Sequence, residues 1–290
     1  MKNTLKKTNG FRIAIYIFLA IAGIICIFPF YNTFLASIST QKEFAKNPLM
    51  LFPKEVTFSA YEYLINVTSF LLGYKNTFFL LLFGLPISMI VSVSTGYAMS
   101  RRNFPGKKVY VFVILFTMYF SGGLIPLYLL MKALNLTNRL LGIVFLGAGN
   151  TFYSILIRNY FKTIPIELEE SAKIDGANDF AVFFKIILPL TIPIMATVLL
   201  FFAVDKWNEW FNVMLMIRDS SKWTIQVMLR NIVFTTLDAM STRMVSVEKT
   251  YYSLSLKMAA IVLTMTPVMI VYPFMQKFFM KGMIVGAVKG

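Results

Sequence analysis

Long runs of apolar residues alternate with short charged segments along the whole chain. A helix needs about 20 mostly apolar residues to cross the hydrocarbon core of a bilayer. Six runs that contain no Asp, Glu, Lys or Arg come close to this length: Ile13–Ala36, Asn76–Ser100, Val109–Leu130, Leu140–Ile157, Ile186–Val204 and Met258–Phe274. The last three runs are short, and we expect them to borrow flanking residues. The pattern predicts an all-α polytopic membrane protein with six transmembrane helices.

Glycine and proline interrupt the second and third runs, at Gly84, Pro86, Gly96, Gly122, Gly123 and Pro126. Small residues let neighbouring helices approach closely, and proline permits kinks. Two roles are therefore open for these positions: close helix packing, or hinges around a pathway. In the fifth run, Pro189 and Pro193 are expected to kink the entry of the helix into the membrane.

The composition supports a membrane protein. Apolar residues make up 58% of the chain and charged residues 14%, and the mean hydropathy is +0.70. A soluble domain is nearer to half apolar and a quarter charged. This chain therefore lacks the polar residues that it would need to cover its own surface in water.

The formal net charge of +15 allows two kinds of anionic partner, nucleic acid and lipid. The basic residues stand at the ends of the apolar runs. This placement favours contact with lipid and a role in membrane topology. We expect no nucleic-acid partner.

Short loops rich in Lys and Arg stay on the cytoplasmic side of a membrane. With the N-terminus inside, that side receives 15 of the 28 basic residues: Lys2, Lys6, Lys7, Arg12, Arg101, Arg102, Lys107, Lys108, Arg158, Lys162, Lys173, Lys185, Lys277, Lys281 and Lys289. Most of the others lie in the long segments 37–75 and 205–257, which translocate largely regardless of charge. Both termini and the 158–185 loop are therefore predicted to be cytoplasmic, and the two long segments to lie outside.

Several kinds of chemistry are excluded by missing residue types. The chain has no histidine and one cysteine, Cys26, so it cannot form a disulfide, a His-based triad or a Cys/His zinc site within itself. The predicted spans lack the ionisable group that a proton-driven transporter needs at depth. Gly106 and Lys107 are followed by Lys108, not by the Ser or Thr of a phosphate-binding loop. We expect no catalytic residue, metal site or cofactor in this chain, and any ATP-driven step belongs to a separate protein.

The stretch TIPIELEESAKIDGANDFAVFFKIILPL, which begins at Thr163, breaks the apolar pattern with five acids. We expect Thr163 to cap a helix from about Pro165 to Asp175, whose early acids are favoured by the helix dipole. Gly176 then supplies a turn that residues with a side chain resist. A second helix follows and enters the fifth span.

A helix of about three turns is marginal by itself, so the first of these helices must dock on something. Its own spans and a partner protein are both open, with Ile166, Ala172 and Ile174 apolar enough to fill a shallow groove. The alternative is a capped helix that lies on the inner membrane surface with its acids in water. Acids are poorly suited to an anionic leaflet, which counts against that alternative.

The same stretch resembles the cytoplasmic signature loop, the EAA motif, of importer permeases in the ATP-binding cassette class. That pattern is Glu-Ala-Ala, three residues, Gly, nine residues, Ile, one residue and Leu-Pro, and the chain matches it with Glu170-Ser171-Ala172, Gly176, Ile186 and Leu188-Pro189. Ser171 is the one departure. The stretches FPFYNTFLASIST, LFPKEVTFSAYEYL, WNEWFNVML and GMIVGAVKG are similar to carbohydrate-importer permeases, above all to the smaller permease of maltose-type systems and to the branch that handles complex oligosaccharides or polysaccharides.

The resemblance implies a single transmembrane permease domain over residues 1–290, in a bacterial plasma membrane, with a cytoplasmic coupling helix. It also implies three kinds of partner: a second homologous permease that completes the carbohydrate pathway, two ATPase subunits that bind ATP and Mg, and an extracytoplasmic sugar-binding protein. The residues carried over for ATPase coupling are Glu170, Ser171, Ala172, Asp175, Gly176, Ile186, Leu188 and Pro189.

Sugar sites favour aromatic faces and amides, because sugar CH groups pack on rings and hydroxyls need donors and acceptors. The candidates for the substrate pathway are Tyr119, Asn150, Tyr153, Trp207, Asn208 and Trp210. Two alternatives are open: the tryptophans can be ordinary interfacial aromatics, and the partner permease alone can hold the sugar. A self-contained secondary carrier or channel for small polar solutes is the alternative function.

Overall fold

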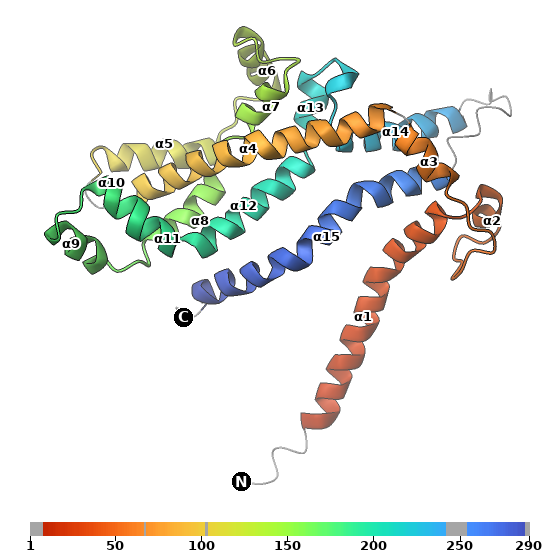
Figure 1. Ribbon diagram of the computed structural model, residues 1–290, viewed down its shortest axis with the longest axis horizontal. Helices are drawn as coiled ribbons and strands as arrows, with labels where there is room; N and C mark the ends of the chain where they lie inside the picture. The colour runs from red at the N-terminus through yellow and green to blue at the C-terminus, as the bar shows by residue number, and fades with distance from the viewer. Residues whose placement is uncertain (1–7, 67, 102–103, 242–253, 288–290) are drawn as a thin grey trace. The chain divides into compact units, whose positions relative to one another are not determined.

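The computed structural model describes residues 8–66, 68–101, 104–241 and 254–287. Residues 242–253 of the predicted outer segment 205–257 lie outside this description, as do Arg102, Lys289 and the N-terminal lysines counted for orientation. Within the described residues the secondary structure is helical, apart from an isolated bridge between Ser39 and Val56. The helices drawn in Figure 1 are α1 (Thr8–Ser37), α2 (Gln41–Lys46), α3 (Ser59–Asn66), α4 (Thr68–Ser100), α5 (Lys107–Tyr119), α6 (Leu124–Ala133), α7 (Leu140–Leu146), α8 (Thr151–Phe161), α9 (Glu167–Ile174), α10 (Asp179–Val182), α11 (Leu188–Leu190), α12 (Ile192–Trp207), α13 (Phe211–Met216), α14 (Ile225–Ser241) and α15 (Leu254–Ala287).

Three helices are long and apolar enough to cross a membrane, within α1, α4 and α15. Three further pairs meet the same test together but are bent: α5 with α6, α7 with α8, and the Asp179–Leu190 segment with α12. If each bent pair is one span, the described chain has up to six, and they coincide with the six apolar runs. The all-α membrane fold predicted from the sequence is confirmed.

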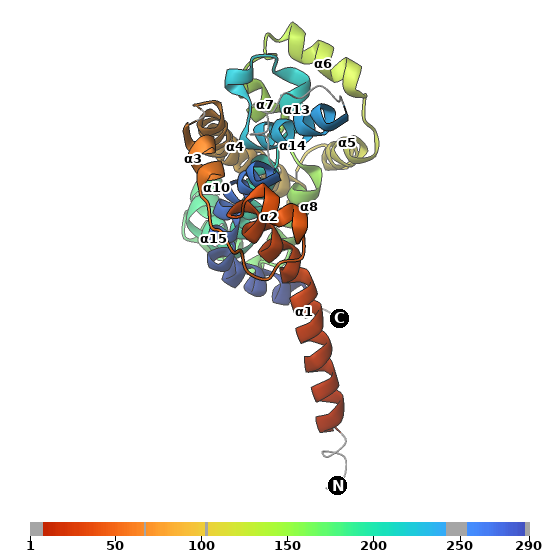
Figure 2. The same ribbon diagram turned by 90° about the vertical axis from the view of Figure 1, so that its right-hand side faces the viewer.

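The third apolar run forms two helices and not one. Helix α6 makes an angle of 115° with α5 and turns away from it in both ribbon views (Figures 1 and 2). Gly123 stands at this break with a φ of +89°, a conformation that favours glycine. Of the two roles considered for these glycines, helix packing and hinge, Gly123 is at a change of chain direction and not at a packing contact.

The entry into the fifth span is kinked, as Pro189 and Pro193 predicted. The segment from Phe183 to Ile187 is π-helical, and α12 then leaves at 75° to the segment before it. Thr191 lies at the bend, and its hydroxyl donates to the carbonyl of Leu188 at 2.8 Å. The backbone amide of Thr191 also donates to this carbonyl, at 3.1 Å, so the hydroxyl is a second donor at the bend.

The described chain divides into two compact units. The first comprises Met1–Thr68 and Leu229–Thr266, and the second comprises Ser69–Met228 and Pro267–Gly290. In the first unit, the hydroxyl of Ser255 donates to the carbonyl of Ser39 at 2.8 Å, and this bond is buried. It ties the start of α15 to the chain just after α1.

Helix α8 lies at the centre of one hydrophobic cluster of the second unit. It contacts α5 and α12, and the fully buried Ile157 and Phe161 of α8 pack with Val93 of α4 and Val198 of α12. Gly96 brings α4 close to α8, because a Cβ atom there would lie 2.9 Å from the carbonyl oxygen of Ser154. Gly96 is therefore a position of close helix packing, which is the first of the two roles considered for these glycines.

A second cluster joins α4 to α7 and α13 through side chains that include Leu80, Val144 and Val213. Asn76, at the start of the second predicted span, donates to the carbonyls of Ser221 and Trp223 at 2.8 and 2.9 Å. Residues 206–228 of the predicted outer segment are therefore folded against α4, and the amide of Asn76 has a structural role.

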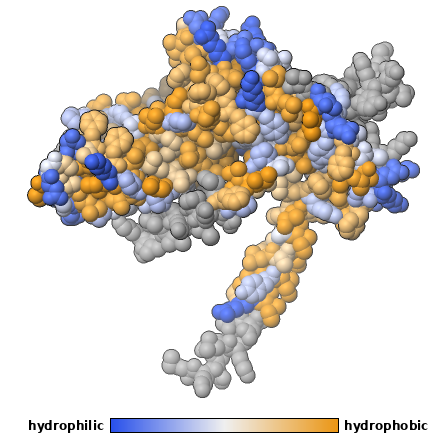
Figure 3. Space-filling view, viewed as in Figure 1, coloured by the Kyte–Doolittle hydropathy of each residue, from blue (hydrophilic) through white to orange (hydrophobic). Residues whose placement is uncertain are grey.

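Hydrophobic residues cover much of the visible surface along α1 and along the helices of the second unit (Figure 3). Hydrophilic residues gather at the helix ends. In α1 the most apolar window has no buried residue. Apolar surface of this extent is expected where helices contact lipid or another membrane subunit.

We predict that Gly96→Ala lowers the free energy of unfolding by about 1–3 kcal/mol, because the added methyl group overpacks the α4–α8 contact. Gly23→Ala in α1 is the matched control, since nothing lies within 4 Å of a Cβ atom at that position. Both changes raise helix propensity equally. Thermal unfolding of the solubilised protein measures the difference, and equal melting temperatures for the two variants would contradict the close packing.

Candidate functional site

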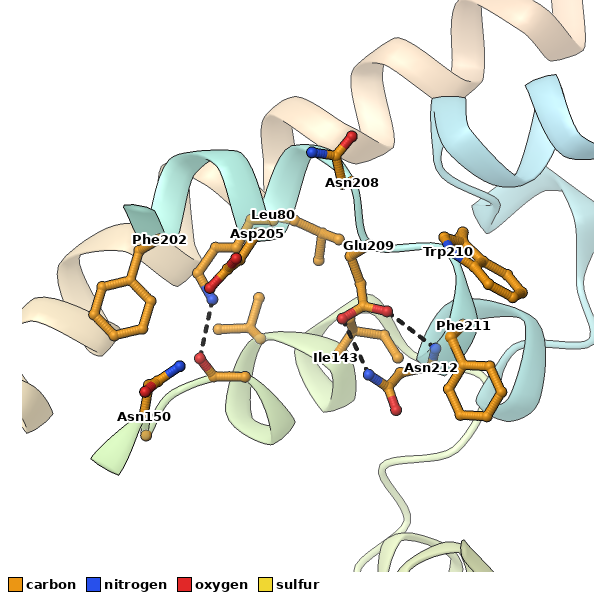
Figure 4. A pocket seen from close by; sticks show the side chains of 14 residues that line it. Leu80, Ile143, Asn150, Phe202, Asp205, Asn208, Glu209, Trp210, Phe211 and Asn212 are labelled. Carbon is orange, nitrogen blue, oxygen red and sulfur yellow. Dashed lines mark hydrogen bonds between the residues drawn. The ribbon is translucent and has the colours of Figure 1, made fainter. Parts of the chain in front are cut away.

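A polar pocket of about 450 Å³ lies where the C-terminal end of α12 meets the break between α7 and α8 (Figure 4). It is lined by Leu80, Ile143, Val144, Gly147, Gly149, Asn150, Phe202, Asp205, Lys206, Asn208, Glu209, Trp210, Phe211 and Asn212. Its volume is in the range of small-molecule sites, and it combines aromatic faces with amides and charges. We call it the α12 pocket.

Lys206 is the most buried ionisable residue of this pocket, with 7% of its surface exposed. Its side chain crosses Gly84 of α4, where a Cβ atom would come within 2.6 Å of the Cε atom. Its ammonium group donates to the carbonyl of Gly147 at 3.2 Å, and Ser88 of α4 donates to the same oxygen at 3.0 Å. The C-terminal end of a helix carries partial negative charge, so the ammonium group is well placed at the C-terminal end of α7.

The two acids of the α12 pocket have partners other than Lys206. Asp205 accepts a hydrogen bond from the hydroxyl of Tyr153 at 2.8 Å. Glu209 accepts from the backbone and the side-chain amide of Asn212, each at 3.0 Å (Figure 4). Within the part of the chain that the structure describes, neither acid forms an ion pair with Lys206. The lysine therefore keeps donors for which a bound ligand can supply acceptors.

The structure brings three of the six sugar-site candidates into this pocket, namely Asn150, Asn208 and Trp210. Tyr153 reaches its wall through Asp205. The other two candidates lie elsewhere. Trp207 is buried and packs on Phe78, with ring centroids 6.0 Å apart, and Tyr119 is 87% exposed at the end of α5.

The sequence prediction missed the charged residues of the pocket. It ended the fifth span at Val204, before the first charge, and concluded that the spans contain no ionisable group. Helix α12 continues to Trp207, so Asp205 and Lys206 belong to its last turn. The available signal was the DKWNEW stretch, in which three charges alternate with two tryptophans directly after an apolar run.

The acidic stretch after α8 forms a helical elbow, which we define as residues 163–182. Its helix α9 begins at Glu167, and Ile166 takes the N-cap position. The predicted cap is wrong: the hydroxyl of Thr163 instead donates backwards to Tyr160 at 2.8 Å. Thr163 therefore closes the last turn of α8 and does not open the next helix.

The end of α9 matches the prediction at Gly176, whose φ is +82°. The amide of Gly176 donates to Lys173 at 3.1 Å, and that of Ala177 donates to Ala172 at 2.9 Å. This pair of bonds is the Schellman motif, in which glycine is favoured because it takes a left-handed conformation without strain. Asn178 then caps α10 by accepting from the amide of Ala181 at 2.8 Å.

One face of the elbow is docked on its own chain. Ala172 is buried in the cluster that contains Ile157 and Phe161. Glu169 forms an ion pair with Arg101 at the end of α4, and the guanidinium group lies 4.4 Å from the centre of the Tyr97 ring. Docking on the chain's own spans, one of the two possibilities open from the sequence, is what the structure shows.

The opposite face of the elbow is free in this chain. Ile174 and Phe180 are 86% and 77% exposed. Of the three residues considered for a groove contact, Ala172 is buried on its own chain, and for the exposed Ile166 and Ile174 a groove on a partner protein stays a prediction. The remaining motif residues divide the same way: Glu170, Ser171, Asp175, Gly176 and Pro189 are exposed, whereas Ala172 is buried and Ile186 and Leu188 are half-buried. The exposed set contains both acids and large apolar side chains.

A helical membrane protein with a polar pocket among its spans has the features of a membrane transport protein. The chain matches, over residues 65–285, the family described as the binding-protein-dependent transport system inner membrane component. The match covers most of the chain, and the chain belongs to this family.

Similar proteins cover the chain almost completely. It is 39% identical over 290 residues to the polygalacturonan/rhamnogalacturonan transport system permease protein YtcP of Bacillus subtilis (strain 168), covering 98% of this chain and 100% of that protein. It is 37% identical over 291 residues to protein LplC of the same organism, covering 100% of this chain and 98% of that protein. A chain in the crystal structure of a bacterial ABC transporter involved in the import of the acidic polysaccharide alginate is 34% identical, with a TM-score of 0.85 and coverage of 96% of this chain and 99% of that chain.

We predict that Arg101→Gln loosens the docking of α9 by about 1–2 kcal/mol, between the values for exposed and buried ion pairs. Amide hydrogen exchange in α9 should become about tenfold faster. Lys173→Gln, in α9 itself, is the matched control. It also removes a charge from an ion pair, but its pair with Asp179, at 2.8 Å, is exposed and does not join α9 to the spans. The docking described here is wrong if exchange in α9 is the same in the two variants.

Proposed function

We propose that this protein is the permease subunit of an ATP-binding cassette importer for a carbohydrate, an oligosaccharide or a polysaccharide. The observation that carries the proposal is the family match over residues 65–285, together with a permease named for polygalacturonan and rhamnogalacturonan transport that is alike over its full length. The chain itself catalyses no bond change in this proposal. ATP and Mg bind to the partner ATPase subunits.

The α12 pocket supports a role in the sugar pathway. Trp210 and Phe211 offer aromatic faces to the CH groups of a sugar ring. The side-chain amide of Asn208 already donates to the carbonyl of Val204 and accepts from Gln226, which leaves one N–H and one oxygen lone pair for hydroxyls. Glu209 is already oriented by Asn212, so its carboxylate can accept further bonds without being reordered. A second homologous permease completes the pathway, and an extracytoplasmic sugar-binding protein delivers the substrate.

The elbow supports coupling to ATPase subunits. Its exposed face combines Glu170 and Asp175 with Ile174 and Phe180, a mixture of polar rim and apolar anchors that suits a protein interface. Its inner face is held to the spans by Ala172 and by the Arg101–Glu169 pair. A push on the outer face therefore reaches α4 and α8, which can exchange between two discrete packings as the pathway opens and closes.

The proposed function implies one orientation of the chain in the membrane. The elbow and both termini face the cytoplasm, and residues 37–75 and 205–257 lie outside, in a multi-pass protein of the bacterial cell membrane that forms one permease domain over residues 1–290. Two ATPase subunits contact the two permeases, one at each elbow. The loop charges support this arrangement, because the short loops carry the excess of Lys and Arg.

A self-contained secondary carrier is the second candidate, and one observation favours it. Lys206 is a buried ionisable residue in a helix that belongs to a candidate span, and such residues often mark ion or proton routes. Uptake by the purified chain in vesicles that contain no ATP would favour the carrier. Uptake that requires the ATPase subunits and ATP would favour the importer.

We predict that Ile174→Ser and Phe180→Ser reduce sugar-dependent ATP hydrolysis by the reconstituted complex about tenfold each, as expected for the loss of an apolar anchor in an interface. Both side chains are exposed in this chain, so its own folding should not change. Leu49→Ser is the control, at an apolar position of the predicted outer segment that is 70% exposed. Hydrolysis and ATPase co-purification at wild-type levels in both elbow variants would rule out the coupling role.

We predict that Trp210→Ala and Asn208→Ala each weaken the apparent affinity for the transported sugar about five- to tenfold, because each removes a contact worth about 1 kcal/mol. Tyr119→Ala should leave it within about twofold, since that ring lies away from the pocket. The measurement is the concentration of sugar that half-saturates uptake. Unchanged values for both pocket variants would mean that the partner permease alone holds the sugar.

A further inference from the structure

A second polar pocket, of about 560 Å³, lies at the opposite end of α4 and α8 from the α12 pocket. Three candidate spans have their ends here, because α4 ends at Ser100, α5 begins at Lys107 and α8 ends at Phe161. The elbow supplies another wall through Ile166 and Glu169. We call it the span-end pocket. It is separate from the proposed sugar pathway, and the proposed ATPase contact lies on the other, exposed face of the elbow.

The span-end pocket gathers more positive charge than its acids neutralise. Arg101, Lys107 and Lys162 line it, together with Glu167 and Glu169. Glu169 is engaged by Arg101, and the ammonium group of Lys107 donates to the backbone carbonyl of Arg101. Within the described residues Lys162 has no ion pair, and Glu167 is exposed on the elbow.

The surroundings of Lys162 are those of a cation without an anion. Lys162 is exposed, yet its pKa lies below its usual value, first because of desolvation and then because Arg158 and Lys107 repel its charge. Arg158 precedes it by one helical turn, a spacing at which like charges destabilise a helix. The Nε atom of Arg158 is itself buried without a hydrogen-bond partner among the described residues. A bound anion would relieve this repulsion.

A phosphate group fits these features better than other anions. It is compact, and its several oxygens can accept from more than one ammonium group at the same time. The ends of the spans place the pocket at the edge of the membrane, where basic pockets between transmembrane helices bind lipid headgroups. The half-buried apolar side chain of Ile164, which also lines the pocket, can contact the first methylene groups of a lipid acyl chain.

We propose that the span-end pocket binds a phosphate group, with the side chains of Lys107 and Lys162 as its ligands. The group can belong to an anionic phospholipid of the leaflet on the elbow side or to a soluble phosphate ester. Because Ile166 and Glu169 of the elbow form part of the wall, the bound phosphate also ties the elbow to the ends of α4 and α8. The proposal does not rest on the identity of the sugar or on the ATPase partner.

The test measures the binding of phosphatidylglycerol by native mass spectrometry. The sample is the full-length chain, purified with any subunits that accompany it. The double variant Lys107→Gln, Lys162→Gln is compared with the control pair Lys108→Gln, Lys185→Gln, which removes the same charge from exposed lysines that do not line the pocket. We expect the affinity of the tightest lipid to fall about fivefold for each pocket charge, or about 25-fold in all, and to stay near wild type in the control.

Two further arms identify the source of the phosphate. Phosphatidylcholine should not replace phosphatidylglycerol if the pocket selects an anionic headgroup. Glycerol phosphate that displaces the lipid from the wild type would show that the pocket also takes a soluble ester, and failure to displace it would assign the pocket to lipid alone. Equal phosphatidylglycerol affinities in the pocket variant and the control pair would overturn the proposal.

Discussion

The hydrogen bond from Lys206 to the carbonyl of Gly147 holds the candidate site together. A break between two helices, such as that between α7 and α8, leaves carbonyl groups without helical partners, and where the helices cross a membrane each such group must be satisfied by the protein. Lys206 of α12 and Ser88 of α4 both donate to this carbonyl. Gly84 makes the arrangement possible, because a side chain there would occupy the path of the lysine. The α12 pocket opens over this junction.

Helix α12 connects the two regions to which we assign function. Its Val198 and Phe202 pack in the same cluster as Ala172 of the elbow, while Lys206 and its neighbours line the pocket. A packed cluster moves between discrete arrangements and resists continuous deformation. Movement of the elbow relative to the spans would therefore shift the residues that line the α12 pocket. The shift would pass through the packing of α8 and α12 and would need no loop between the two regions.

The two pockets at opposite ends of α4 and α8 differ in their balance of charge. At the α12 pocket, Asp205 and Glu209 accompany one buried lysine, and each acid is oriented by a neighbour. At the span-end pocket, cations outnumber acids and crowd one another. The first arrangement suits a neutral or hydroxyl-rich ligand that makes many directional bonds, and the second suits a small anion. Helices α4 and α8 thus contribute to a site for a hydroxyl-rich ligand at one end and to a site for an anion at the other.

The sequence by itself determined the fold class, the positions of the candidate spans, the kink at Pro189 and Pro193 and the turn at Gly176. Each of these follows from local physics: the length of an apolar run, the fixed φ of proline and the tolerance of glycine for a left-handed backbone. Only the tertiary structure decided that Lys206 is buried, that Ala172 faces inward while Ile174 faces outward, and that Tyr119 lies away from the pocket. The burial of a charge depends on what distant segments offer it. For Lys206 that is a glycine on α4 and a carbonyl 59 residues earlier in the chain, and no local pattern shows either.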